Sequence, residues 1–230
     1  IIIIEAGMGQ GKTEAALACA EILAQKTGRT GLYFALPTQA TSDGIFPRLF
    51  QWAKKLGDEE HSINLVHGKA QFNDAFQILK RTGKSHNIDI DNEGGALVHP
   101  WFEGPKKSLL ADFVVGTIDQ LLMVALKQKH VMLRHLGLSQ KVLIIDECHA
   151  YDTYMSQYLY QALHWLGTYG VPVIILSATL PSATRQKLID AYLGNEKTKQ
   201  AELDLFGRRV NEPLCTPAWA NSQSYPLLTF

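Results

Sequence analysis

The sequence predicts an α/β protein whose mostly parallel sheet is covered by helices on both faces. Short apolar runs alternate with helical stretches along residues 1–193, and this alternation requires right-handed crossovers between parallel strands. Polar motifs follow several of the runs directly, as expected at the carboxyl ends of parallel strands, where such sheets bind ligands. The first run leads into a glycine-rich loop and a helix, which is the setting of a phosphate-binding loop.

The expected elements follow a regular order. Periodicity and composition predict strands at residues 1–5, 32–36, 63–66, 113–117, 142–145 and 171–176. Helices are expected at residues 14–23, 46–56, 69–81, 118–126, 154–166 and 182–193, the last with Ser182 as N-cap. Together these elements form one expected domain over residues 1–193, followed by an irregular connector at residues 194–230, within which residues 225–230 could begin another element.

Residues 82–107 interrupt the order and are expected to form an insertion or mobile loop. An acidic, polar stretch is followed by the turn-forming, basic run at residues 104–107. Trp101 and Phe102 lie within this span. Either they stack on nucleic-acid bases beside the lysines, or they anchor the loop to the domain.

Composition limits the class of protein. The 22 basic and 22 acidic residues balance, so a grip on nucleic acid would be local or shared with other domains. No apolar run reaches the length of a membrane span, and the opening isoleucines are too few for a signal peptide. The three scattered cysteines include no Cys-x-x-Cys pair, which favours a reducing cytoplasm over a disulfide or zinc framework. Because the chain opens on isoleucine within a strand, we expect an excised piece of a longer protein.

The loop after the first strand carries the groups that bind a nucleoside triphosphate. Its glycines let backbone N–H groups point at one anion, and the following helix adds its positive N-terminus. Lys12 supplies a charge for the β- and γ-phosphates, and the Thr13 hydroxyl suits Mg²⁺. Ala6 stands where the usual pattern opens with glycine. An ordinary glycine-rich turn is the alternative, disfavoured by Lys12-Thr13 at the required offset.

Asp146 and Glu147 follow a buried run directly, so they emerge at a strand end. Adjacent strand residues point to opposite sides, which allows two roles. Asp146 would hold Mg²⁺, partly through water, and Glu147 would orient the water that attacks the γ-phosphate. Alone, this pair could be a solvated strand end. His149 would relay the state of the γ-phosphate or be structural, and Cys148 is expected to pack.

These residues carry a family resemblance. The loop at residues 6–13, the run Asp146-Glu147-Cys148-His149 and the run Ser177-Ala178-Thr179 resemble motifs I, II and III of superfamily 2 helicases. Further runs resemble the CRISPR-associated helicase–nuclease of type I interference, at residues 5–17, 35–42, 115–120 and 149–152. The resemblance implies a three-layer P-loop NTPase, the first of two RecA-like lobes, with ATP and Mg bound between the lobes.

The resemblance also implies a role for each matching residue. Nucleotide contacts would come from Ala6, Gly7, Gly9, Gln10, Gly11, Lys12, Thr13 and Glu14. Catalysis would involve Lys12, Asp146, Glu147 and His149, with Mg on Thr13 and Asp146. Coupling between ATP and DNA would involve Ser177, Ala178 and Thr179. Contacts to the DNA backbone would come from Pro37, Thr38, Gln39, Gly116, Thr117, Asp119 and Gln120, although Thr38 and Gln39 suit a helix cap equally well.

The implied partners are single-stranded DNA, an RNA-guided CRISPR surveillance complex, and a second RecA-like lobe and HD nuclease domain in the same parent chain, without a membrane. The chain contains no His-Asp dipeptide. The Gln-x-x-Gly-Arg pattern occurs at residues 25–29, but there it falls at the stop of the first helix, so the second lobe's arginine motif is expected elsewhere in the parent protein. We therefore expect no DNA cleavage by this chain, and weak ATP binding with little turnover by the isolated lobe. Two alternatives stay open: another superfamily 2 DNA or RNA helicase, and an ATP-gated switch that does not translocate.

Overall fold

The computed structural model describes residues 1–56, 61–70, 73–85, 96–104, 107–148, 151–194 and 227–229. These residues form an eight-stranded sheet in the order β4-β3-β5-β2-β6-β7-β1-β8. The strands are β1 (Ile2–Glu5), β2 (Gly31–Leu36), β3 (His61–Val66), β4 (Ala96–Leu97), β5 (Phe113–Thr117), β6 (Lys141–Ile145), β7 (Val173–Ser177) and β8 (Leu227–Thr229). All pairings are parallel except that of β8 with β1, so the predicted fold class is confirmed.

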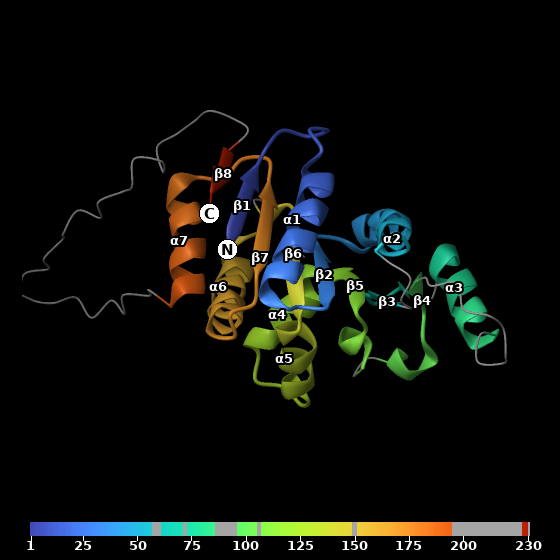
Figure 1. Ribbon diagram of the computed structural model, residues 1–230. Helices are drawn as coiled ribbons and strands as arrows, with labels where there is room; N and C mark the ends of the chain where they lie inside the picture. Colours follow the sequence, from blue (N-terminus) through green and yellow to red (C-terminus); the bar gives the residue numbers. More distant parts are fainter. Residues whose placement is uncertain are drawn as a thin grey trace, which may run out of the picture.

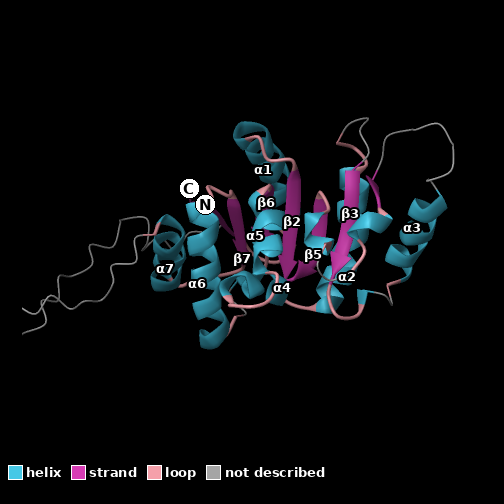
Figure 2. Ribbon diagram, turned by 90° about the horizontal axis from the view of Figure 1, so that it is seen from below, coloured by secondary structure: helices cyan, strands magenta, loops and turns pink. Residues whose placement is uncertain are grey.

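Helices cover both faces of the sheet (Figure 1). They are α1 (Lys12–Thr27), α2 (Gln39–Ala53), α3 (Asp74–Ser85), α4 (Ile118–Leu122), α5 (Val131–Ser139), α6 (Thr153–Thr168) and α7 (Ser182–Leu193). Short 3₁₀ turns lie at η2 (Pro100–Phe102), η3 (Ser108–Leu110) and η4 (Met123–Ala125). Helices α7 and α3 lie at opposite ends of the sheet (Figure 2).

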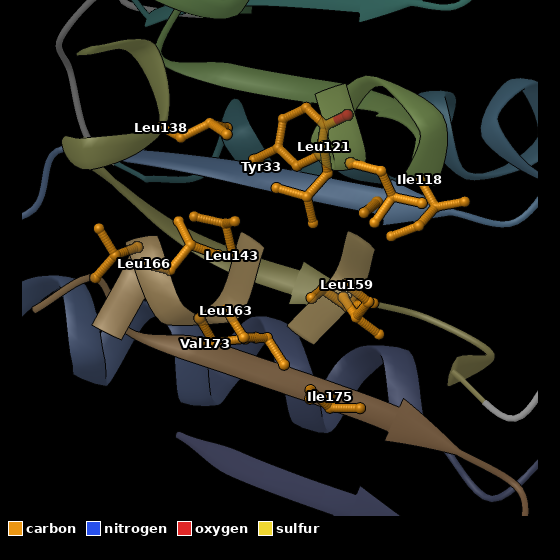
Figure 3. Close-up of a cluster of buried hydrophobic side chains, with 14 of the residues drawn as sticks. Tyr33, Ile118, Leu121, Leu138, Leu143, Leu159, Leu163, Leu166, Val173 and Ile175 are labelled. Carbon is orange, nitrogen blue, oxygen red and sulfur yellow. The ribbon is translucent and has the colours of Figure 1, made fainter. Parts of the chain in front are cut away.

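Two hydrophobic cores follow from the alternation of side chains along each strand. Phe34 faces the first core, which lies under α1, α2 and α3. Its neighbour Tyr33 faces the second core, which lies under α4, α5, α6 and α7. In the second core, Leu163 and Leu166 of α6 lie beside Leu143, and Leu159 lies further along the same helix (Figure 3). On the strand side both cores consist mainly of β-branched, leucine and aromatic residues, which is typical of a sheet buried on both faces.

Several element boundaries differ from the expected ones. Helix α2 begins at Gln39 rather than near residue 46, because Thr38 and Thr41 form a capping box. Helix α3 begins at Asp74, after Asn73 accepts a hydrogen bond from the backbone of Phe76. Helix α5 was not predicted, and α7 is preceded by Pro181 rather than capped by a Ser182 side chain.

The described part of residues 82–107 is partly regular. It contains the end of α3, the edge strand β4 and the turn η2, while residues 86–95 lie outside the described part. Phe102 packs against the second core and its carbonyl accepts a hydrogen bond from Asn64 Nδ2 at 3.1 Å. Phe102 is therefore an anchor, whereas Trp101 is 52% exposed with Lys107 Nζ 4.6 Å from its ring centre.

The end of the expected connector also belongs to the sheet. Residues 195–226 lie outside the described part of the chain, but β8 pairs with β1 through Ile3–Thr229, Ile4–Leu228 and Glu5–Leu227. This strand lies within residues 225–230, where the sequence allowed a further element to begin, and it forms because the open edge of β1 offers backbone groups to a returning strand. Within the described ranges, no helix has the length and apolarity needed to cross a membrane.

Candidate functional site

The carboxyl ends of β6, β7 and β1 lie side by side and bring three sequence motifs together. Ile145 pairs with Ile175, and Glu5 pairs with Ser177. Because adjacent strands are about 4.8 Å apart, the ends of β1 and β6 lie roughly 10 Å apart, with β7 between them. The glycine loop, the acidic pair and the Ser177 run therefore occupy one edge of the sheet.

The glycine loop wraps around the ammonium group of Lys12. Lys12 Nζ donates to the Ala6 carbonyl at 2.7 Å and to the Gly7 carbonyl at 3.4 Å. Gly11, which precedes α1, has φ 75° and ψ 23°, a left-handed conformation that strains other residues. The Gly7 N–H donates to Gln10 Oε1 at 2.9 Å. A charged amine beside the free amides of a helix N-terminus is suited to a phosphate group.

The departure at Ala6 is compatible with this loop. Ala6 is buried and does not have a positive φ, so its position does not require glycine. Its N–H donates to the Ser177 carbonyl at 3.2 Å and continues the pairing of β1 with β7. Glu14 forms an exposed ion pair with Arg48 of α2, and its contact with the nucleotide stays a prediction.

The acidic pair lies just beyond β6 in a fixed turn. The Asp146 N–H donates to the Ala35 carbonyl, and the Glu147 N–H donates to Asp146 Oδ1, both at 2.9 Å. Glu147 has φ 52°, which is uncommon for a residue other than glycine. The premise that both carboxylates lie on the strand is therefore wrong, because β6 ends at Ile145 and both residues belong to the turn that follows it.

Tyr151 contacts the same turn. Its hydroxyl donates to the Asp146 carbonyl at 2.8 Å. Burial, followed by the nearby Cys148, Asp146, Tyr33 and Glu147, raises the pKa of Tyr151 above its ordinary value, so that its hydroxyl remains a donor. Sequence reasoning noted Tyr151 only as part of a family run and assigned it no role.

The structure tests the prediction for Cys148 but not the one for His149. Cys148 is buried in the second core, and burial raises the pKa of its thiol to about 12. The expectation that Cys148 packs is confirmed. His149 lies outside the described residues, so its proposed relay role stays a prediction.

The Ser177 run is tied to the start of the glycine loop by buried charges. Ser177 Oγ donates to the Thr179 carbonyl at 2.9 Å. The N–H of Leu180 donates to Glu5 Oε2 at 3.0 Å, and Arg185 Nε donates to Glu5 Oε1 at 2.7 Å. The side chains of Arg185 and Glu5 are 2% and 0% exposed. Sequence reasoning missed this pair, although a glutamate ending an apolar run was a visible signal.

The candidate DNA-contacting residues lie at the ends of β2 and β5, which are adjacent in the sheet. Leu36 pairs with Thr117, so the exposed Thr38 and Asp119 follow neighbouring strand ends. The Thr38 side chain accepts from the Thr41 N–H at 3.2 Å, which confirms its capping role. Thr117 is buried, whereas exposed Asp119 is available to a ligand.

Two other candidates there, Gln120 and Gly116, have contacts within the fold. Gln120 Oε1 accepts from Arg134 Nη1 at 3.1 Å. Gly116 is buried, and a Cβ at Gly116 would lie 2.7 Å from the Tyr33 hydroxyl and 2.9 Å from the Val66 carbonyl. This close packing is a sufficient structural reason for glycine at residue 116.

The architecture is that of a RecA-like P-loop NTPase lobe. A glycine loop follows the first strand, an acidic pair lies two strands away, and helices cover both faces of the sheet. Residues 1–188 match the family described as DEAD/DEAH box helicase, and the chain belongs to this family.

Within this family, the chain is similar to CRISPR-associated proteins in particular. The chain is 52% identical to the CRISPR-associated nuclease/helicase Cas3 of Streptococcus thermophilus over its whole length, but spans 24% of that relative. It is similar to the crystal structure of T. fusca Cas3-ADP, with a TM-score of 0.77 and 38% identity over 99% of this chain and 23% of that one. A chain of a CRISPR RNA-guided surveillance complex, pre-nicking, matches with a TM-score of 0.59 and 38% identity over 83% of this chain and 17% of that one. The resemblance expected from the motifs is confirmed.

Proposed function

We propose that this chain is the ATP-binding motor lobe of a larger DNA helicase that acts in type I CRISPR interference. The convergence of Lys12, Asp146-Glu147 and Ser177 at one sheet edge supports this proposal most directly. The similarity to Cas3 proteins and to a surveillance-complex chain supports the pathway. The chain spans about a quarter of the length of these relatives, so the second RecA-like lobe and the nuclease domain would lie elsewhere in the parent protein.

In this proposal the N-terminus of α1 and Lys12 bind the triphosphate. Thr13 and Asp146 offer the hydroxyl and carboxylate oxygens that Mg²⁺ prefers, and so fit that ion. The metal would neutralise charge on the β- and γ-phosphates. Glu147 accepts a hydrogen bond from a water whose oxygen bonds to the γ-phosphorus. The bond from that phosphorus to the bridging oxygen then breaks, releasing ADP and phosphate.

The DNA strand would cross the ends of β2 and β5. Thr38, Gln39 and Asp119 lie at this edge with hydroxyl, amide and backbone groups that suit contacts without base specificity. The isolated lobe would turn over slowly, because an arginine in trans or cis contributes about 10³-fold or more to such reactions. That arginine would come from the second lobe.

The test measures ATP hydrolysis by the full-length protein with single-stranded DNA, single-stranded RNA or no nucleic acid. Lys12→Ala removes the phosphate contact, and Lys26→Ala, at the other end of α1, is the matched control. We expect strong stimulation by DNA alone, abolished by Lys12→Ala and retained in Lys26→Ala.

Three outcomes would contradict this reading. Equal stimulation by RNA would indicate another superfamily 2 helicase, and equal rates without nucleic acid would indicate an ATP-gated switch. A further arm adds a target-bound surveillance complex; if this complex fails to stimulate hydrolysis, the pathway is contradicted while the motor activity stands.

A further inference from the structure

The peptide group between Asp146 and Glu147 is held from both sides. Its N–H, which belongs to Glu147, donates to Asp146 Oδ1 at 2.9 Å. Its carbonyl, which belongs to Asp146, accepts from the Tyr151 hydroxyl at 2.8 Å. Rotation of this peptide would change the φ of Glu147 and hence the direction of its carboxylate. We infer that Tyr151 is a positioning residue, whose hydroxyl fixes the carboxylate of Glu147 for its role in ATP hydrolysis.

The backbone of Glu147 needs such support. Its φ of 52° is in the left-handed region, where a side chain crowds the backbone. A non-glycine residue stays there only when its surroundings over-determine the conformation. The hydrogen bond from the Asp146 N–H to the Ala35 carbonyl fixes the strand side of the turn. The Tyr151 hydroxyl fixes the other side.

Tyr151 is itself held by the start of α6. The next residue, Asp152, caps this helix by accepting from the Met155 N–H at 2.7 Å, and the Tyr151 ring packs against the second core. The hydroxyl thus extends from a fixed helix end toward the turn. Removing it leaves the ring in place and frees one side of the peptide.

The chain provides a matched control in Tyr192. Its hydroxyl also donates to a backbone carbonyl at 2.8 Å, that of Val171, and it too is partly buried against the second core. This bond joins α7 to the segment just before β7, at the end of the strand remote from the glycine loop. Tyr192→Phe therefore loses the same kind of bond without touching the acidic turn.

The inference rests on the proposed function, because it assigns Glu147 a part in hydrolysis. The test measures DNA-stimulated kcat and KM for ATP in the full-length protein for Tyr151→Phe, Tyr192→Phe and Glu147→Gln, with the Tm of each variant. We expect Tyr151→Phe to lower kcat by about tenfold, the equivalent of one hydrogen bond lost in the transition state. Its KM should stay unchanged, Tyr192→Phe should keep wild-type kcat, and both should lower Tm similarly.

The possible results distinguish failure of the positioning role of Tyr151 from failure of the proposed function. If Tyr151→Phe and Tyr192→Phe have equal kcat while Glu147→Gln has lost turnover, the positioning role is wrong and the proposed function stands. A rise in KM with unchanged kcat in Tyr151→Phe would also overturn the positioning role. Full turnover by Glu147→Gln would instead refute the role assigned to Glu147, and with it the basis of the inference.

Discussion

Replacing Arg185 with methionine should destabilise this domain more than an ordinary charge deletion. Arg185 Nε donates to Glu5 Oε1 at 2.7 Å, and both side chains are buried. Methionine keeps most of the apolar length of the side chain and removes its charge. The Glu5 carboxylate then stays in a site with 0% exposure, without its guanidinium partner. Breaking a buried pair in this way costs about 3–5 kcal/mol, a large share of the ~5–15 kcal/mol typical of a domain.

The loop after β7 should share this loss. The N–H of Leu180 donates to Glu5 Oε2 at 3.0 Å, and its carbonyl accepts from Arg185 Nη2 at 3.4 Å. The ion pair therefore fixes Leu180 between the Ser177 run and α7. A double variant, Glu5→Leu with Arg185→Met, removes both charges but leaves the Leu180 N–H without Glu5. We expect the double variant to recover part of the stability and to retain a cost of about 1–3 kcal/mol.

Urea-induced unfolding measures these differences at constant slope. Arg48→Met is the matched control, because it breaks the ion pair of Arg48 with Glu14 at an exposed position. Exposed pairs contribute about 0–1 kcal/mol. If Arg185→Met costs no more than Arg48→Met, the buried pair does not stabilise the fold and the reasoning is refuted. A double variant less stable than Arg185→Met alone would refute the argument that the uncompensated charge dominates.

Two further predictions concern packing and pH. Gly116→Ala should lower the free energy of unfolding in urea by about 1–3 kcal/mol, because the new Cβ would lie 2.7 Å from the Tyr33 hydroxyl. The control Gly44→Ala meets no atom within 4 Å and should be neutral or stabilising. Equal effects of the two substitutions would contradict the packing argument. Burial lowers the pKa of Lys141 from 10.5 to about 8, so the unfolded chain binds more protons between these values and stability should rise across this pH window. The free energy of unfolding measured at pH 7.5 and at pH 10 gives the size of this rise, which Lys141→Met should remove. An unchanged rise in Lys141→Met would exclude Lys141 as its source.

The fold class and the phosphate loop were predictable because their signals are local. A β-branched run, glycines at fixed offsets and a helix of strong formers specify strand, loop and helix within about 25 residues. The strand ends carrying Asp146 and Ser177 were visible for the same reason. Parallel pairing then places all such ends at one edge of a sheet, so the sequence alone predicted which motifs meet.

Short or atypical elements escaped prediction. Strand β4 has two residues and β8 has three, too few for an alternating pattern. Their strand conformation comes from pairing with an existing edge rather than from their own composition. Helix α2 was expected to begin near residue 46, after the polar, hydroxyl-rich run at residues 38–43, but the capping box at Thr38 starts the helix at Gln39.

The sequence by itself determined the order of the elements, the phosphate loop and the residue types available for ATP chemistry. Only the tertiary structure decided that Glu5 meets Arg185, that Tyr151 holds the Asp146 carbonyl, and that Glu147 adopts a left-handed turn. The physical reason is that these features depend on the free energy of burying and pairing groups from different elements. Glu5 and Arg185 are 180 residues apart, and no local pattern encodes which distant partner compensates a buried charge.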